Sequence, residues 1–119
     1  MTTQTAPRLR SIGNTINDAA VTTVYTCPAN FTSKVTLVFI SNRTNGNVVV
    51  RLSWDDASNG LPHNILSAYT IGGYQFLQLS DAYLVLNSGD RLEVETFSGA
   101  QIDVIVSCEE FYDPAQTRP

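Results

Sequence analysis

The stretch Lys34-Val35-Thr36-Leu37-Val38-Phe39-Ile40-Ser41-Asn42 indicates the fold class of this chain. Successive side chains of a β-strand point to opposite faces, and both faces of this segment are largely apolar. Such a pattern is typical of a central strand that is covered on both sides. We therefore expect a strand over 34–42, with Val35, Leu37 and Phe39 facing the core.

Turn signals divide the rest of the chain into further short extended segments. Asn45-Gly46 follows the central strand and tolerates the positive φ of a tight hairpin. Pro62 indicates an irregular or edge segment. No window of more than ten residues has the apolar spacing of an amphipathic helix. The predicted strands are 21–26, 34–42, 47–54, 65–71, 74–79, 83–86, 91–97 and 101–108.

Short strands separated by regular turns predict an all-β fold, a two-sheet antiparallel β-sandwich with jelly-roll or Greek-key connections. We expect the sandwich domain to span 17–110, between an extended N-terminal arm over 1–16 and a C-terminal tail over 111–119. The predicted core consists of Val35, Leu37, Phe39, Val50, Leu52, Leu92, Val94, Ile102, Val104 and Val106.

The composition excludes several classes of partner. The chain has 119 residues, 43% of them hydrophobic, and a net charge of −4, which suits one domain. Its basic residues are scattered, whereas nucleic-acid binding needs a concentrated basic footprint.

No apolar run approaches the roughly 20 residues of a membrane helix, and no secretory signal is visible. We expect a cytoplasmic origin, with Cys27 and Cys108 unpaired.

Residues able to support catalysis are sparse. His63 is the single histidine, and a hydrolase would need it to converge with Asp55 and Asp56. Adjacent acids in a strand point in opposite directions, and the spacing of a calcium loop is missing. We expect no enzyme activity, no catalytic residues, no metal and no cofactor.

Exposed aromatic rings provide an alternative function. Small β-sandwiches that bind sugars stack the sugar rings on tryptophan and tyrosine. Trp54, Tyr69, Tyr74 and Tyr83 are the candidates for a carbohydrate-binding module. Trp54, however, continues the apolar alternation of strand 47–54, which favours the core or its rim. The tyrosines are equally suited to a subunit interface.

Four segments within residues 21–110 form an ordered pattern: 24–32 (VYTCPANFT), 35–42 (VTLVFISN), 86–94 (LNSGDRLEV) and 105–110 (IVSCEE). In this order they resemble the small β-sandwich subunits of tailed-bacteriophage virions. The resemblance implies a virion protein assembled in the host cytoplasm: a head decoration or cement subunit, or a neck, tail or fibre component. It transfers no catalytic residues.

The two termini lie outside the resemblance and carry little apolar material for their own burial. We expect them to contact other subunits, in a homotrimer that also binds the major capsid protein or another phage virion protein. The predicted partner-binding residues are Arg8, Leu9, Arg10, Phe111, Tyr112 and Arg118.

Overall fold

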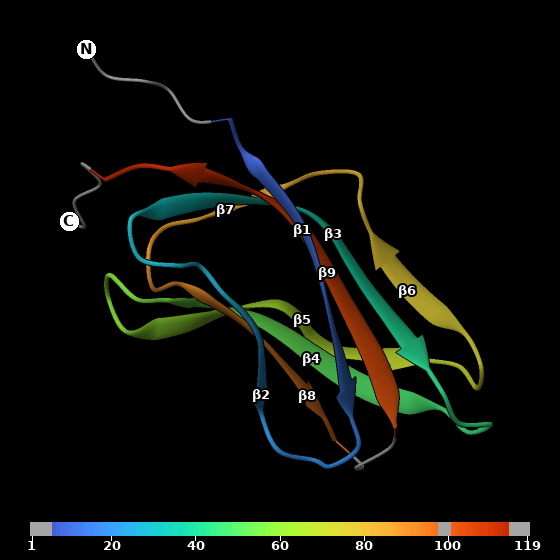
Figure 1. Cartoon of the computed structure of the whole chain (residues 1–119). Coiled ribbons are helices and arrows are strands. Elements are labelled where there is room, and N and C mark those ends of the chain that lie inside the picture. Colours follow the sequence, from blue (N-terminus) through green and yellow to red (C-terminus); the bar gives the residue numbers. More distant parts are fainter. Residues whose placement is uncertain (1–5, 98–100, 115–119) are drawn as a thin grey trace.

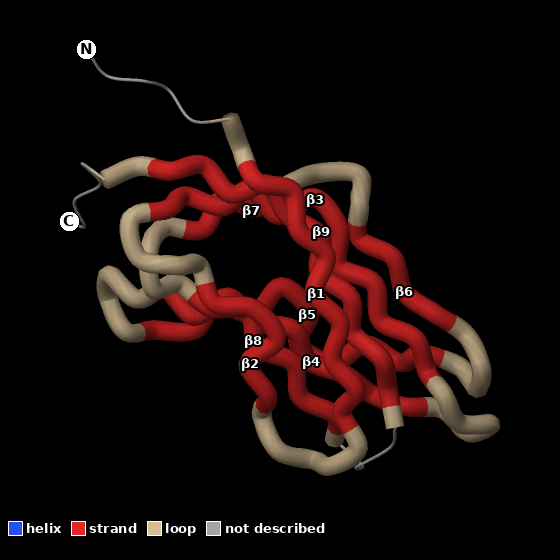
Figure 2. The backbone as a smooth tube through the Cα atoms, in the orientation of Figure 1, coloured by secondary structure: helices blue, strands red, loops and turns tan. Residues whose placement is uncertain are grey.

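The computed structural model describes residues 6–97 and 101–114, and in these ranges it contains nine strands and no helix (Figures 1 and 2). No helix long and apolar enough to cross a membrane occurs in the described ranges. The strands are β1 (Arg8–Ile16), β2 (Thr22–Thr26), β3 (Phe31–Asn42), β4 (Val48–Asp56), β5 (Leu61–Ile71), β6 (Phe76–Leu79), β7 (Leu84–Leu86), β8 (Arg91–Thr96) and β9 (Ile102–Tyr112).

The strands pair in a nested order, in which the first strand pairs with the last and the middle strands pair with each other. β1 pairs with β9, β2 with β8, β3 with β6 and β7, and β4 with β5, and every one of these pairs is antiparallel. The first sheet, sheet A, has the order β1-β9-β3-β6 with β7 also on β3, and the second, sheet B, has the order β2-β8-β4-β5. This nested pairing is the jelly roll. The sandwich prediction is confirmed, and of its two predicted connection types the structure has the jelly roll.

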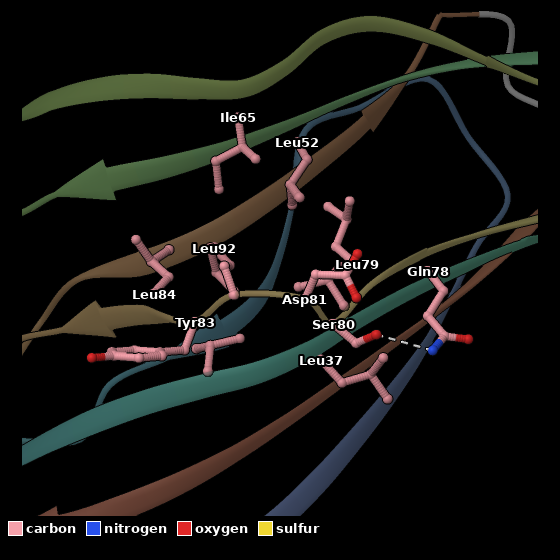
Figure 3. Close-up of a pocket in the computed structure, with 13 residues that line it drawn as sticks. Leu37, Leu52, Ile65, Gln78, Leu79, Ser80, Asp81, Tyr83, Leu84 and Leu92 are labelled. Atoms are coloured by element: carbon pink, nitrogen blue, oxygen red, sulfur yellow. Dashed lines mark hydrogen bonds between the residues drawn. The ribbon is translucent and has the colours of Figure 1, made fainter.

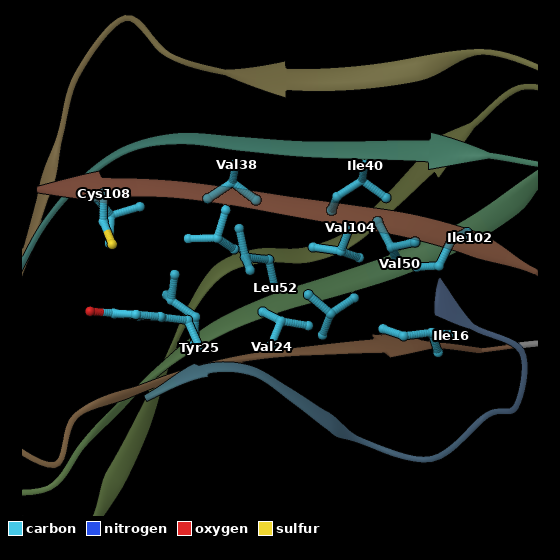
Figure 4. Packing of buried hydrophobic residues seen from close by; sticks show 14 of the residues in the cluster. Ile16, Val24, Tyr25, Val38, Ile40, Val50, Leu52, Ile102, Val104 and Cys108 are labelled. Carbon is cyan, nitrogen blue, oxygen red and sulfur yellow. The ribbon is translucent and has the colours of Figure 1, made fainter. Parts of the chain in front are cut away.

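The core lies between the two sheets, as the close-up in Figure 4 shows. Alternation along β4, β8 and β9 predicted its members correctly: Val50, Leu52, Leu92, Ile102, Val104 and Val106 are fully buried, and Val94 nearly so. The strands that alternate without interruption therefore face the core as expected.

The prediction for the central strand is only half correct. β3 is central in sheet A, but its register against β9 shifts between Val35 and Leu37. This β-bulge reverses the alternation, so that Val35, Val38 and Ile40 are buried while Leu37 and Phe39 are half-buried on the outer face. The outer face has no covering layer in the described part of the chain.

The Asn45-Gly46 turn does not form the predicted hairpin, because it leads from β3 in sheet A to β4 in sheet B. Buried Asn42 organises this crossing: its side-chain nitrogen lies 2.7 Å from the carbonyl oxygen of Gly46 and 3.0 Å from that of Gly72. A Cβ at Gly73 would lie 2.2 Å from the Asn45 carbonyl oxygen, so the two turns pack backbone against backbone.

The boundaries of the expected arms are also corrected. Residues 8–16 form β1 and pair along their whole length with β9. β9 in turn continues to Tyr112, beyond the predicted end at Cys108. Both segments pair with strands about 80 to 100 residues away in the sequence, which local composition does not reveal. Residues 1–5 and 115–119 lie outside the described ranges.

Candidate assembly surface

The outer face of sheet A carries large apolar side chains from several strands. Phe76 on β6 is 59% exposed and stacks on Phe39, with ring centroids 5.0 Å apart. Ile105 pairs with Phe39 from the opposite side and is 38% exposed. Val85, which pairs with Lys34, faces the same way. We call this surface the apolar face; its members are Leu9, Leu37, Phe39, Phe76, Val85, Ile105 and Phe111.

Both outer faces also carry ion pairs, Lys34 with Glu109 and Arg43 with Asp103 on sheet A and two further pairs on sheet B. Arg51 on β4 forms an ion pair with Glu95 on β8, and Arg91 on β8 forms one with Asp55 on β4. Each pair joins residues that lie directly opposite each other in the β4–β8 register. Cross-strand ion pairs of this kind suit a surface in contact with water.

The predicted partner-binding residues that the structure describes lie on both faces of sheet A, some on the outer face and some on the face toward sheet B. Leu9 is 75% exposed and pairs with Glu109, while Phe111 lies two residues further along β9 on the same side. Both join the apolar face. Arg8, Arg10 and Tyr112 belong to the other side. Arg118 lies outside the described residues.

Arg8 and Arg10 fasten β1 to β9 through Glu110. The Nε of Arg8 donates to Glu110 Oε1 at 2.7 Å, and an Arg10 nitrogen lies 3.1 Å from Oε2. The Arg8 guanidinium also lies over the Phe31 ring, whose centroid is 5.5 Å from that of Tyr112. These residues therefore make contacts within the chain, and their role in partner binding stays a prediction.

Glu110 also joins the two sheets. The hydroxyl of Tyr25 on β2 donates to its carboxylate, and Ser33 on β3 hydrogen-bonds the same hydroxyl. Burial opposes ionisation of Glu110, but hydrogen bonds from Tyr25 and Arg8 and the charge of Arg10 outweigh it and lower the pKa of the carboxyl. Burial, reinforced by Glu110, raises the pKa of the Tyr25 hydroxyl.

The two cysteines adjoin this buried group and are free, as predicted. Ser33 Oγ lies 3.3 Å from Cys27 Sγ. Burial raises the pKa of the Cys27 and Cys108 thiols, so both are kept in the unreactive thiol form.

The aromatic candidates do not form one sugar platform. Trp54 is only partly exposed, packs against the core, and donates its indole N–H to buried Asp90 at 3.2 Å. Tyr83 lies just before β7, and the Lys34 ammonium is 4.6 Å from its ring centroid. Tyr69 and Tyr74 are exposed on β5 and in the turn after it. The four rings thus belong to four separate places.

The residues considered for a hydrolase meet at Asp56 in a different arrangement from a catalytic triad. His63 Nε2 lies 4.0 Å from Asp56 Oδ2, and the Ser58 hydroxyl donates to Asp56 Oδ1 at 2.7 Å. In a triad the histidine contacts the serine, whereas here both contact the carboxylate. Asp55 pairs with Arg91 instead. Asp56 therefore stabilises the β4–β5 turn.

An apolar cavity of about 380 Å³ lies between the sheets at the side where β5, β6 and β7 run (Figure 3). It forms where sheet A is interrupted, because the chain leaves the sheet between β6 and β7, over 80–83. Leu79, Leu84 and Tyr83 line it from this side, and Leu52 and Ile65 from sheet B. Within the described ranges, no three His, Cys, Asp or Glu side chains are grouped to hold a metal ion.

Sequence reasoning missed Phe76, Val85 and Ile105 as surface candidates. A signal was present: in 104–106 (Val-Ile-Val), apolar residues occupy both faces of the strand. One face fills the core and the other forms the apolar face.

Comparison with known proteins yields no family. No protein-family model matches the chain, and no curated protein matches its sequence. Among solved structures, it is similar to a chain in the cryo-EM structure of the giant freshwater prawn Macrobrachium rosenbergii extra small virus (XSV) VLP. The identity is 14% over 98% of this chain and 85% of that one, with a TM-score of 0.46. The fold assignment accordingly rests on the strand pairing of this chain itself.

Proposed function

We propose that this protein is a structural subunit of a virion, which associates with its own copies and binds a larger virion protein through the apolar face of sheet A. The observation that carries the proposal is that face: Phe76, Val85 and Ile105 remain in water unless a partner covers them. Phe39 joins Phe76 and Ile105 into one exposed apolar group, and such groups mark sites of protein association.

The position of the apolar side chains supports an assembly role. Both sheets present ion pairs outward, but on sheet A the side chains of Leu37 and Phe39 add apolar surface at the centre of the sheet. The jelly roll is a common architecture of viral capsid domains. This supports a virion role by analogy alone, since a fold does not determine a function.

Within the virion class, the sequence resemblance favours a tailed-phage accessory protein, either a head decoration or cement subunit or a neck, tail or fibre component. We propose a ring about a threefold axis, assembled in the host cytoplasm and bound to the major capsid protein or another virion protein. The reduced state of Cys27 and Cys108 suits a reducing compartment. No catalytic role enters the proposal.

The test is incorporation of the labelled chain into virus particles purified from cells that produce it. Phe76→Lys and Val85→Lys place charge on the apolar face and should lower occupancy at least about tenfold, because a desolvated lysine opposes docking. Val21→Lys is the matched control, since Val21 is 49% exposed and Val85 44%, but Val21 lies in the β1–β2 connection. Equal occupancy of all three variants, or absence of the wild-type chain from particles, would contradict the proposal.

A further inference from the structure

The cavity between the sheets exists because sheet A is interrupted on the side away from β9. β3 pairs with β7 up to Val35 and with β6 from Val38 onward, so no strand in the described ranges pairs with residues 36–37 on this edge. The segment that connects β6 to β7 contributes Ser80 and Ala82 to the cavity wall, and both side chains are small. The interruption therefore leaves a space of about 380 Å³ that the protein does not fill itself.

Most of the cavity wall is apolar. Val38, Leu79 and Leu84 line the cavity from the side of sheet A, and Ile65 lines it from sheet B. Water in such a space has few hydrogen-bond partners, so apolar cavities stay dry or take up an apolar molecule. Apolar pockets of this volume with a few convergent polar groups are typical sites for small molecules.

The volume distinguishes a small molecule from an inserted side chain of a partner protein. An apolar cavity of about 150 Å³ already accommodates benzene, which is the size of a phenylalanine ring. The present cavity has about 380 Å³. One inserted aromatic side chain would leave more than half of it empty, whereas an aliphatic chain fills it by adding methylene groups. The volume therefore favours an aliphatic small molecule.

The polar groups of the cavity lie together on one side. Figure 3 shows Gln78, Ser80 and Asp81 to the right of the space, opposite Tyr83 and Leu84. Gln78 Nε2 lies 3.1 Å from Ser80 Oγ. None of the ion pairs formed in the described part of the chain involves Asp81. An amphiphile can therefore place its polar head on this side and its chain along the apolar wall.

Charge selects the head group. The Asp81 carboxylate accepts hydrogen bonds from a hydroxyl or ammonium group and repels another carboxylate. Among the described residues that line the cavity, none is a lysine or arginine. Lys34 contacts the Tyr83 ring from outside this lining, but its charge is paired with Glu109 at 3.9 Å. The site therefore disfavours a fatty-acid anion.

We propose that this cavity binds the aliphatic chain of an amphiphile whose head donates hydrogen bonds, a hydroxyl or an ammonium group, with that head beside Asp81. The bound chain would contact Ile65 from sheet B and Leu79 and Leu84 from the other side, and so join the sheets where sheet A is interrupted. The proposal goes beyond the proposed function and does not depend on it, because a sandwich domain can hold such a ligand whatever it assembles with.

The first experiment measures the affinity of the purified protein for hexan-1-ol, octan-1-ol and decan-1-ol by isothermal titration calorimetry. Each methylene group that enters the cavity should tighten binding about fourfold, the equivalent of about 0.8 kcal/mol, until the space is full. Octan-1-ol should therefore bind about 15-fold more tightly than hexan-1-ol. An affinity that does not depend on chain length, or no binding of any alcohol, would overturn the proposal.

A matched pair of variants on β5 locates the binding site. Ile65 and Tyr69 are each 43% exposed, but only Ile65 lines the cavity. Ile65→Trp should fill the space and weaken octan-1-ol binding at least about tenfold, because the larger ring excludes the chain. Tyr69→Trp should leave the affinity unchanged. Thermal unfolding without ligand checks that both variants fold, and equal affinities of both for octan-1-ol would place binding elsewhere and reject the cavity.

The head group is tested with decan-1-amine and decanoate at pH 7. The wild type should bind decan-1-amine at least about tenfold more tightly than decanoate, because Asp81 attracts the ammonium and repels the carboxylate. Asp81→Lys should reverse this order. Asp113→Lys makes the same change of charge outside the cavity lining and should preserve the order. Preference of the wild type for decanoate, or reversal by both variants, contradicts the assignment of the head group.

A side chain of a partner protein is the alternative occupant. If Ile65→Trp lowers incorporation into particles and no alcohol binds the purified wild type, the partner fills the cavity and the ligand proposal is wrong. If octan-1-ol binds the wild type and Ile65→Trp is incorporated normally, the ligand proposal is supported. The proposed function is tested separately, because it depends on the response of incorporation to Val85→Lys.

Discussion

The outer faces of the two sheets both carry ion pairs, between Lys34 and Glu109 on sheet A and between Arg51 and Glu95 on sheet B, but they differ in their apolar side chains. On sheet B, Arg51 and Arg91 form ion pairs across the strands, so water is the natural neighbour. On sheet A, Phe39, Phe76 and Ile105 form an apolar surface. Apolar residues on an outer face contribute less to folding than those inside, and their grouping on sheet A is the basis of the proposed assembly surface. The comparison thus separates the buried core, which stabilises the domain, from the apolar face, which is proposed to bind other subunits.

The largest expected effect comes from neighbouring residues on opposite sides of β3. Ile40 is fully buried, and Ile40→Ala should reduce the free energy of unfolding by about 4 kcal/mol. Phe39→Ala should cost only about 1–2 kcal/mol, because the Phe39 ring is half-buried against Phe76. Urea unfolding of both variants measures the difference. A loss at Phe39 as large as at Ile40 would mean that the apolar face is part of the core.

The next comparison uses adjacent glutamates on β9. Glu110→Ala removes the buried carboxylate that joins Arg8, Arg10 and Tyr25, and should cost about 3 kcal/mol. Glu109→Ala breaks a partly exposed pair with Lys34, whose charged atoms are 3.9 Å apart, and should cost less than about 1 kcal/mol. The same urea titration serves, and equal losses would show that Glu110 is not a structural link between the sheets.

The pH dependence of stability tests whether the charge of the Glu110 carboxylate stabilises the fold. The folded-state pKa of Glu110 is lowered, so the carboxylate stabilises the fold at pH values above its ordinary pKa. This contribution should begin to diminish as pH falls below the ordinary glutamate pKa, and it should be lost as pH falls through the lowered folded-state pKa. Thermal unfolding of wild type and Glu110→Gln between pH 7 and 3 provides the measurement. The difference between them should shrink on acidification; a constant difference would assign the effect to packing.

The smallest expected effect concerns the turn at the edge of the apolar face. Tyr74 has φ of 58°, a left-handed conformation that is costly for a bulky residue, and it is mostly exposed. Tyr74→Gly should therefore stabilise the protein by about 1 kcal/mol. A rise in the melting temperature tests this. If stability falls instead, the Tyr74 ring contributes contacts that outweigh the backbone strain.

Much of the fold follows from local pattern. β4, β8 and β9 alternate without interruption, so the sequence alone predicts their inner faces at Val50, Val94 and Val104. The turn residues likewise separate the strands at close to their observed ends. Of the candidate surface, only Leu9 and Phe111 were predicted, and the expectation was based on their position near the termini.

Alternation and turn signals act over a few residues, and they determine from the sequence alone that this chain forms an all-β sandwich. Tertiary structure decided the rest, because it depends on partners far along the chain. The bulge that turns Leu37 and Phe39 outward arises from pairing of β3 with β9. The ion pairs of Glu110 with Arg8 and Arg10 join residues about a hundred positions apart. Local pattern describes each strand, whereas the side that meets water or a partner depends on its pairing.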